Sequence, residues 1–317
     1  MQTLDELNDT YGITGLLAFE AGEGGLACAR VSTQACSATL YLQGAHMTQW
    51  QPQGQEPVLF VSEKSVFAAG HAIRGGVPVV FPWFGARSAE LTGGRTDGPS
   101  HGFARTQLWE VAFAAMAGED LHLSLVLSAN ETSRALGFDK FRVVYEMVLG
   151  RTLTLRLGVL NGGEVPLRFE QALHSYFAVG DAEQVRIEGL AGAEYLDKTD
   201  GFKRKRQEEL VLTLRGETDR PYLNTEATVT LDDPVKQRKI VVTKRGSKST
   251  VVWNPWAELA AKMPDMSADG WRQMTCIETA NVADNALTLR PREAYMMEAV
   301  IAVEALRPVV SMSEAAG

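Results

Sequence analysis

The sequence predicts an all-β protein, a large antiparallel β-sandwich of many short strands with a few short helices. Three observations carry this prediction. Segments in which apolar and polar residues alternate recur along the chain, turn-forming residues fall between them, and helical periodicity is scarce. Many short strands joined by turns, with few helices between them, are typical of large sandwiches and barrels.

The elements behind this prediction follow in chain order. Thr3 and Glu6 have the spacing of a capping box, which predicts a short helix near the N-terminus. Turn residues in "NGGE" (161–164) and "KRGSK" (244–248) predict two hairpin connections. The pattern "WAELAAKM" predicts a helix of about two turns over 256–263. The alternating segments predict strands over 121–127, 153–160, 227–231 and 239–243.

Length and hydropathy favour one soluble domain. The chain has 317 residues and shows no repeat period, low-complexity linker or shift in composition, so a single domain over 1–317 is expected. The first residues, "MQTLDELNDT", lack the basic and apolar regions of a secretory signal. The longest apolar stretch, "AYMMEAVIAVEAL", carries two glutamates and is shorter than the roughly 20 residues of a membrane-spanning helix. We therefore expect a cytoplasmic protein that does not enter the membrane.

Charge, cysteines and histidines exclude several classes of function. A net charge of −8 disfavours nucleic acids and anionic membranes, although a few arginines in one pocket still allow a small anionic substrate. Cys28, Cys36 and Cys276 include no CxxC pair, which argues against disulfides and against a cysteine-based zinc site. The five histidines show no HxH, HxxxH or HExxH spacing, so no metal site is expected.

The segment "HAIRGGVPVVFPWFG" at 71–85 has two interpretations of equal weight. In the first, Arg74 is a surface residue beside an edge strand, and Pro78 and Pro82 keep that edge unpaired. In the second, Gly75 and Gly76 let a ligand lie against the backbone while the guanidinium of Arg74 holds its anionic or hydroxyl groups.

The segment "SHGFAR" at 100–105 is a second candidate for ligand binding. It places His101 and Arg105 close together in the chain, after the glycine-rich and proline-rich stretch "TGGRTDGPS". Irregular loops of this kind carry binding residues unusually often.

Two apolar segments each contain one ionisable residue that suits acid–base chemistry. His174 lies in "ALHSYFAVGD", and Glu278 lies in "MTCIETANV". Taken singly, the histidine is more often a core residue, and the glutamate more often faces solvent. Taken together, the two residues are suited to act as an acid and a base on one concave face of a sheet.

Six segments resemble a known family in their order and separation. They are similar to the hexose-6-phosphate mutarotases, also called glucose-6-phosphate 1-epimerases, of the aldose 1-epimerase superfamily. The resemblance extends from about residue 40 to residue 300. It rests on "SEKSVFAAGHAIRGGVPVVFPWFG", "HGFAR", "ALHSYFAV", "GETDRPY", "VVWNPW" and "CIETANV".

The resemblance implies a β-supersandwich of the galactose mutarotase type with a sugar site on a concave sheet face. By the same resemblance, His174 is the general acid and Glu278 the general base. The matching segments make Arg74 and Arg105 ligands of the phosphorylated substrate, Asp219 a ligand of a sugar hydroxyl, and His101 a second histidine near the sugar. Ser100 departs from the pattern, because relatives often have glutamine there; its contact with the substrate would need a bridging water.

The activity that the resemblance implies is the interconversion of the α and β anomers of a hexose 6-phosphate, with glucose 6-phosphate as the expected substrate. A carboxylate and an imidazole suffice for this chemistry, so no cofactor is expected. The partner is a small sugar phosphate, and the protein is expected to be a monomer. Two alternatives stay open: an aldose 1-epimerase acting on unphosphorylated sugars, and a non-catalytic protein that binds sugar phosphates. Without the resemblance, a lectin or a glycan lyase would fit a β-sandwich equally well.

Overall fold

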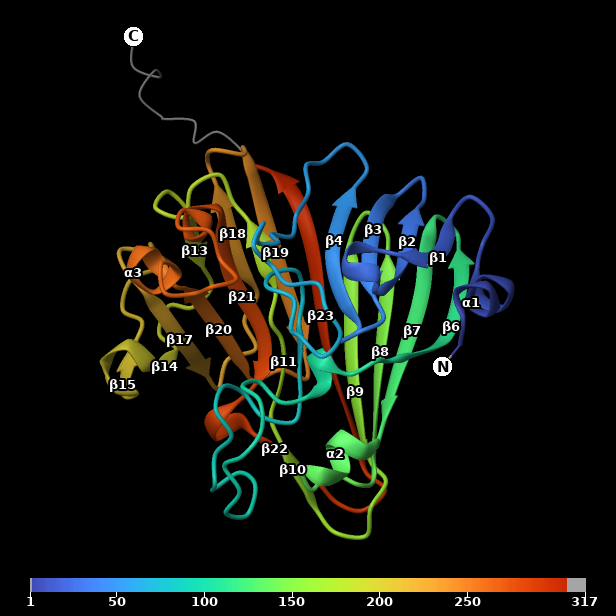
Figure 1. Cartoon of the computed structure of the whole chain (residues 1–317). Coiled ribbons are helices and arrows are strands. Elements are labelled where there is room, and N and C mark those ends of the chain that lie inside the picture. The colour runs from blue at the N-terminus through green and yellow to red at the C-terminus, as the bar shows by residue number, and fades with distance from the viewer. Residues whose placement is uncertain (1, 307–317) are drawn as a thin grey trace.

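The computed structural model describes residues 2–306, and its strands form antiparallel sheets (Figure 1). The all-β prediction is confirmed, because strands dominate the chain and the few helices are short. The N-terminal part forms a four-stranded sheet in the order β1-β2-β3-β4. Its strands are β1 (Leu17–Ala21), β2 (Ala27–Ser32), β3 (Cys36–Tyr41) and β4 (His46–Pro52).

The largest sheet has nine strands in the order β16-β13-β18-β19-β23-β9-β8-β7-β6. Figure 1 shows β23 and β9 to β6 as its long strands, with β6 at one edge of the sheet. The strands of this sheet are β6 (Glu110–Ala117), β7 (Asp120–Ser128), β8 (Phe141–Leu149), β9 (Leu153–Asn161), β13 (Arg186–Glu188), β16 (Val211–Leu212), β18 (Val229–Asp233), β19 (Arg238–Arg245) and β23 (Ala294–Ala305).

A second large sheet has eight strands, seven of them in the order β15-β14-β17-β20-β21-β11-β5, with β12 also paired to β21. A separate two-stranded sheet joins β10 (Leu167–Phe169) to β22 (Leu287–Leu289). The strands of the eight-stranded sheet are β5 (Val79–Val80), β11 (Gln171–Leu173), β12 (Tyr176–Ala178), β14 (Glu194–Asp197), β15 (Lys203–Arg206), β17 (Thr218–Leu223), β20 (Ser249–Asn254) and β21 (Met274–Asn281).

The main hydrophobic core includes one face of the eight-stranded sheet together with residues of the nine-stranded sheet. Leu173, Val252 and Ile277 come from the first, and Leu157 and Ile240 from the second, all in the same buried cluster. Because side chains alternate along a strand, the neighbouring residues of β20 and β21 point to the opposite face. That opposite face lies outside the main core and carries the side chains of the candidate site.

The N-terminal helix matches its prediction. Helix α1 (Leu4–Tyr11) begins with a capping box in which Thr3 and Glu6 each accept a hydrogen bond from the other's backbone. The other helices are α2 (Glu131–Ala135), α3 (Trp256–Ala260) and the 3₁₀ turns Glu23–Gly25, Ala104–Thr106, Lys198–Asp200, Gly270–Gln273 and Ala283–Asn285.

Helix α3 is shorter than predicted. The pattern over 256–263 predicted about two turns, but the α-helix ends at Ala260. Beyond it the chain tightens, since the backbone N–H groups of Lys262 and Met263 donate to carbonyls three residues earlier. Pro264 accounts for this ending, because it has no N–H to donate to the carbonyl of Ala260, four residues earlier, and its ring would clash with that carbonyl.

Both hairpin predictions are wrong, although turns occur at both places. Residues 161–164 follow β9 but lead to β10, which pairs with β22 in another sheet. Residues 244–248 connect β19 of the nine-stranded sheet to β20 of the eight-stranded sheet. Turn residues indicate where the chain bends, but not whether the next strand returns to the same sheet. The predicted strands correspond to β7, β9, β18 and β19, with β18 beginning two residues later than expected.

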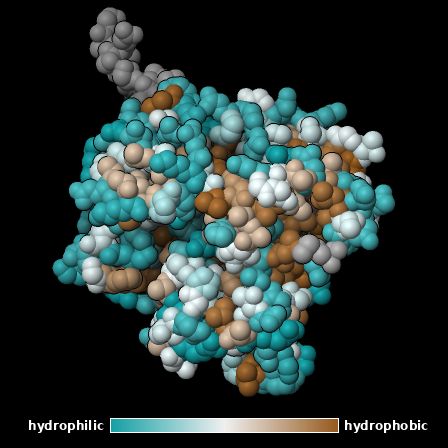
Figure 2. Space-filling model, viewed as in Figure 1, coloured by the Kyte–Doolittle hydropathy of each residue, from teal (hydrophilic) through white to brown (hydrophobic). Residues whose placement is uncertain are grey.

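The surface is mixed in character. Figure 2 shows hydrophilic side chains over much of one face, with apolar side chains gathered mainly over its centre and right-hand part. Within residues 2–306, no helix is long and apolar enough to cross a membrane. The large apolar side chains that are exposed come from scattered positions, namely Val66, Leu108, Phe113, Leu160, Val165, Phe202, Leu210, Val235 and Met296.

Candidate active site

His174 and Glu278 lie side by side because of the strand register. Strand β21 pairs with β11 and with β12, placing Leu173 opposite Thr279 and Tyr176 opposite Cys276. The same register puts His174 opposite Glu278. Their side chains meet on the face away from the main core, with 3.4 Å between His174 Nε2 and Glu278 Oε1.

His174 occupies a break in the sheet, whereas its apolar sequence segment suggested a continuous strand. Strand β11 ends at Leu173 and β12 begins at Tyr176. In the break, the backbone N–H of His174 donates to the carbonyl of Pro78, and the carbonyl of Ser175 accepts from Ile277. The backbone of the break is therefore held from both sides, which fixes the direction of the imidazole.

Both members of the pair are removed from solvent. The exposed fraction is 6% for His174 and 1% for Glu278, so the solvent-facing interpretation of Glu278 is wrong. Burial raises the pKa of Glu278 well above its usual value, and the nearby Asp219 raises it further. Burial also holds the pKa of His174 well below its usual value, and the charges of His101, Arg105 and Arg74 act in the same direction.

The pair forms part of the wall of a small cavity. Opposite strand positions place Asp219, Trp253 and Cys276 in one row across β17, β20 and β21, next to the row that holds Glu278. The cavity combines acidic, basic and aromatic groups in one hollow. Its lining residues are Arg74, Phe84, His101, His174, Lys198, Asp219, Trp253 and Glu278.

Arg74 is the centre of a hydrogen-bonded cluster at the cavity wall. Its Nε donates to Asp265 Oδ2 at 3.0 Å, and one terminal nitrogen donates to the Tyr176 hydroxyl at 3.0 Å. The Tyr176 ring stacks on His174 with 4.8 Å between ring centres and 10° between ring planes. Arg74 is therefore linked to the His174 imidazole through Tyr176.

The two glycines after Arg74 do not have the role that the ligand-binding interpretation of this segment gave them. A Cβ atom on Gly75 would lie 2.3 Å from the carbonyl oxygen of Phe60, and one on Gly76 would lie 2.1 Å from that of Met47. Both glycines also have positive φ, 119° and 62°. The space that they leave is filled by the protein's own backbone, so they position Arg74 and are not the surface on which a ligand lies.

His101 is fixed by the loop that contains Phe84. The backbone of His101 donates to the carbonyl of Gly85 at 2.7 Å, and the backbone N–H of Gly85 donates to His101 Nδ1 at 3.2 Å. Because Nδ1 accepts this bond, the ring proton is on Nε2. The His101 ring centre lies 5.4 Å from that of His174 and 4.7 Å from that of Phe84.

Ser100 and Arg105 lie outside the set that lines the cavity. The carbonyl of Ser100 accepts a hydrogen bond of 2.8 Å from an Arg105 terminal nitrogen. Ser100 is exposed and thus orients Arg105 through its backbone, whereas its hydroxyl was the predicted contact. Among residues 2–306, no carboxylate forms an ion pair with Arg105, although its charge reaches both His101 and His174.

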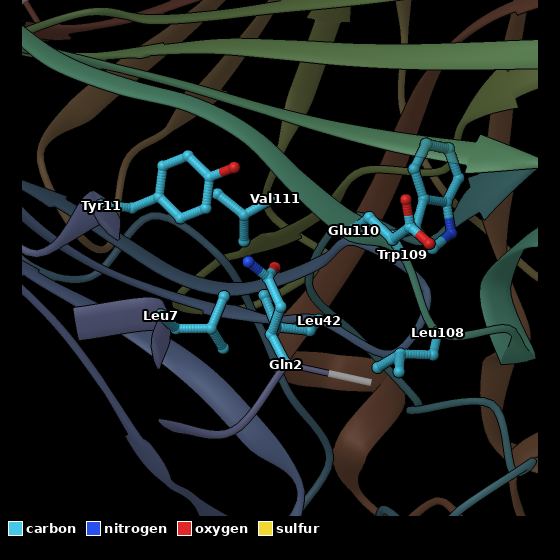
Figure 3. A pocket seen from close by; sticks show the side chains of 8 residues that line it. All are labelled: Gln2, Leu7, Tyr11, Leu42, Leu108, Trp109, Glu110 and Val111. Carbon is cyan, nitrogen blue, oxygen red and sulfur yellow. The ribbon is translucent and has the colours of Figure 1, made fainter. Parts of the chain in front are cut away.

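A second hollow, between α1 and the start of β6, has a different character (Figure 3). Its lining contains one carboxylate and no histidine, lysine or arginine. It therefore offers neither an acid–base pair nor a cation for a phosphate. The lining residues are Gln2, Leu7, Tyr11, Leu42, Leu108, Trp109, Glu110 and Val111.

Comparison with known proteins shows the family of the chain that forms this cavity. The family model described as aldose 1-epimerase matches residues 28–302, a span that contains every residue of the cavity. The chain belongs to the aldose 1-epimerase family. The resemblance inferred from the six sequence segments is thereby confirmed.

This aldose 1-epimerase family member is similar to named relatives in sequence and to a solved structure in fold. A protein of Escherichia coli (strain K12) named "Putative glucose-6-phosphate 1-epimerase" is 32% identical over 263 residues, 83% of this chain and 86% of the relative. A protein of Cenchrus ciliaris with the same name is 32% identical, covering 82% and 79%. The crystal structure of a "putative mutarotase" from Salmonella typhimurium has a TM-score of 0.85 and 30% identity, covering 93% and 96%.

Several residues in or beside this epimerase-family cavity escaped the sequence analysis, including Phe84 and Trp253 of its lining. Lys198 begins a 3₁₀ turn after β14, and its Nζ lies 2.5 Å from Asp219 Oδ2. Asp265, the partner of Arg74, lies in an irregular loop after α3. Neither position has periodicity or a motif that signals its role. For Tyr176 the sequence does contain a signal: it lies two residues after His174, so its side chain is expected on the same face of the sheet.

Proposed function

We propose that this aldose 1-epimerase family member interconverts the α and β anomers of a hexose 6-phosphate, with glucose 6-phosphate as the preferred substrate. One observation carries the proposal: a buried imidazole and a buried carboxyl, 3.4 Å apart, share a cavity with cationic side chains. The pair suits the opening of a sugar ring, and the cations suit a phosphate group.

The chemistry requires one acid and one base. In this proposal Glu278 removes the proton from the C1 hydroxyl while His174 protonates the ring oxygen. The bond between C1 and the ring oxygen then breaks, the C1–O bond becomes a carbonyl, and the open aldehyde results. Rotation about the C1–C2 bond and the reverse proton transfers give the other anomer. Each positioned proton transfer typically contributes about 10² to 10⁴ in rate.

Before substrate binds, we expect the proton of the pair to lie on the carboxyl. Because the pKa of Glu278 is raised and that of His174 is lowered, the neutral pair is favoured before substrate binds. The cationic neighbours Arg74 and Arg105 contribute to the lowered pKa of His174. A bound phosphate offsets those charges, which raises the pKa of His174 and favours the imidazolium–carboxylate pair that the reaction needs.

Three cations are available for the phosphate, but they differ in their existing partners. Arg74 already pairs with Asp265, and Lys198 already pairs with Asp219. Arg105 has no carboxylate partner within residues 2–306, so in this proposal it contributes most to phosphate recognition. Arg74 completes the anion clamp while also holding Tyr176 against His174.

Asp219 and His101 suit the sugar hydroxyls. Asp219 lies in the cavity and points its carboxylate toward Lys198, and the Nε2–H of His101 has no hydrogen-bond partner among residues 2–306 and lies beside the His174 ring. Ser100 stays a predicted contact through a bridging water, since its hydroxyl does not line the cavity.

Anomer exchange measured by NMR tests the substrate. Glucose 6-phosphate and free glucose are compared for the wild-type chain, for Arg105→Ala and for Arg186→Ala, an exposed arginine on β13 that serves as the control. We expect Arg105→Ala to lower kcat/KM at least about tenfold for glucose 6-phosphate, because a charge-assisted bond contributes roughly 1.5–3 kcal/mol. The activity of Arg105→Ala on free glucose should change little. The control Arg186→Ala should behave as the wild type on both substrates.

Two results would replace this proposal with another. Equal losses on both substrates would favour the aldose 1-epimerase that acts on unphosphorylated sugars. Binding of glucose 6-phosphate without any acceleration of anomer exchange would favour the non-catalytic sugar-phosphate protein.

A further inference from the structure

Cys276 lies beside the His174–Glu278 pair and has no part in the proposed proton transfers. It precedes Glu278 by two residues on β21, so the two side chains point to the same face. One possible ligand atom from each of His174, Cys276 and Glu278 lies within 4.8 Å of the other two. All three residues are buried, and Cys276 is 0% exposed.

The distances suit a tetrahedral zinc ion. Zinc binds histidine nitrogen and carboxylate oxygen at about 2.1 Å, so two such atoms on adjacent corners of a tetrahedron are about 3.4 Å apart. His174 Nε2 and Glu278 Oε1 are separated by 3.4 Å. The longer Zn–S bond of about 2.3 Å allows a separation of about 3.6 Å from the other ligand atoms. Since the three ligand atoms lie within 4.8 Å of one another, the thiol needs to approach by about 1.2 Å at most.

The carboxylate of this cluster lacks partners within the described part of the chain. Neither oxygen of Glu278 has a hydrogen-bond partner there, although the side chain is 1% exposed. Nδ1 of His174 is also without a partner. A buried carboxyl that makes no hydrogen bond and faces a cavity is ready to accept a ligand.

We propose that His174, Cys276 and Glu278 form a three-ligand site for Zn²⁺ whose occupation inhibits the enzyme. The fourth position of the ion faces the cavity and takes a water molecule or a sugar hydroxyl. The ligands come from the break between β11 and β12 and from β21, which explains why no spacing motif marks the site.

Inhibition follows from the identity of the ligands. A zinc ion on His174 and Glu278 occupies the lone pairs that the acid and base need, so substrate and ion compete. Binding releases the Cys276 proton, and the Glu278 proton where that group is protonated, to solvent. Thiolate and imidazole ligands favour Zn²⁺ over Mg²⁺ or Ca²⁺.

The cations around the cavity weaken this site without excluding it. Arg74 is paired with Asp265 and Lys198 with Asp219, so each of these two positive charges is offset by a carboxylate. Arg105 is the unpaired cation nearby within residues 2–306. We therefore expect inhibition by Zn²⁺ in solution, and the ion has no part in the catalytic steps.

Binding and inhibition are measured separately on the full chain, because inhibition rests on the proposed function and binding does not. Binding of Zn²⁺ is measured by calorimetry, and Co²⁺ serves as a probe whose bond to a thiolate gives charge-transfer absorption. Both use the wild type, Cys276→Ala and the control Cys28→Ala, a buried cysteine outside the cavity. Anomer exchange is then measured with increasing Zn²⁺, at low and high glucose 6-phosphate.

We expect one ion per chain, cobalt–thiolate absorption, and inhibition that substrate relieves. Cys276→Ala should lose the absorption, need at least about tenfold more zinc for inhibition, and keep its activity without metal; Cys28→Ala should behave as the wild type. Unchanged binding in Cys276→Ala, or an active wild type that binds no zinc, would overturn the site. Zinc binding that depends on Cys276 in a chain without epimerase activity would instead support the site and contradict the proposed function.

Discussion

At the scale of single residues, the pair is unusual because two ionisable groups are buried with few partners. Glu278 is 1% exposed, and neither of its oxygens has a hydrogen-bond partner among residues 2–306. Removing a carboxylate from water without such partners is costly, so the folded protein favours its protonated form. In the proposed mechanism, the stability lost there is the physical cost of keeping an acid–base pair out of water.

This cost predicts how stability depends on pH. The pKa of Glu278 is raised in the folded chain above 4.5, its usual value. At a pH between the usual pKa and the raised pKa, the folded state holds a proton on Glu278 that the unfolded state has lost. The free energy of unfolding therefore falls as the pH rises through this range. The Glu278→Gln variant cannot ionise. We expect it to melt at a higher temperature than the wild type at pH 8, by a larger margin than at pH 5.

Thermal melts at several pH values check this prediction. Glu146→Gln on β8, in the nine-stranded sheet, is the control for replacing a glutamate by glutamine. A margin for Glu278→Gln that stays constant from pH 5 to pH 8 would contradict the raised pKa of this carboxyl.

The sequence predicted some of these residues and not others, for physical reasons. His174 and Glu278 stood out because a charged or titratable side chain in an apolar segment is unusual. Their roles as acid and base stay predictions, as do the substrate contacts of Arg74, Arg105, Asp219, His101 and Ser100. Lys198 and Asp265 could not be found, since a loop residue acquires its neighbours only when the chain folds.

At the scale of elements, the break between β11 and β12 and the glycines before β5 position the site. The backbone N–H of Tyr176 donates to the carbonyl of Gly76, so the glycine segment lies against the break itself. Gly76 combines a positive φ with a close approach to Met47. Both features exclude a larger side chain.

This packing predicts a large effect of Gly76→Ala. The new Cβ would lie 2.1 Å from the Met47 carbonyl oxygen, so the backbone must move in addition to bearing the strain of a positive φ. Gly118→Ala is a matched control, because Gly118 has a φ of 65° against 62° and nothing within 4 Å of its Cβ position. Strain alone contributes roughly 1–3 kcal/mol.

Denaturant unfolding measures both variants. We expect Gly76→Ala to lose clearly more stability than Gly118→Ala, and to lose activity as the break next to His174 shifts. Equal losses in the two variants would mean that the contact with Met47 does not constrain the site.

At the scale of the whole molecule, two large sheets share one core and leave the second face of the eight-stranded sheet for chemistry. Residues such as Leu173 and Ile277 point into the core, while His174 and Glu278, the next along the chain, point into the cavity. Alternation in the sequence was sufficient to predict strands and the all-β class. The assignment of strands to sheets was not predictable, as the two wrong hairpins show, because it depends on contacts far apart in the chain. A single domain over 1–317 stays a prediction.

The most direct test of the account is whether His174 and Glu278 act in one chemical step. His174→Asn, Glu278→Gln and the double variant are compared with the wild type by NMR anomer exchange of glucose 6-phosphate, with thermal melts alongside. His122→Asn on β7 is the control for histidine loss. We predict that each single variant stays folded and loses at least about 10² in turnover, and that the double variant is little worse than either, because both groups serve the same step. Near-normal turnover per folded molecule in His174→Asn, or losses that multiply in the double variant, would contradict the account.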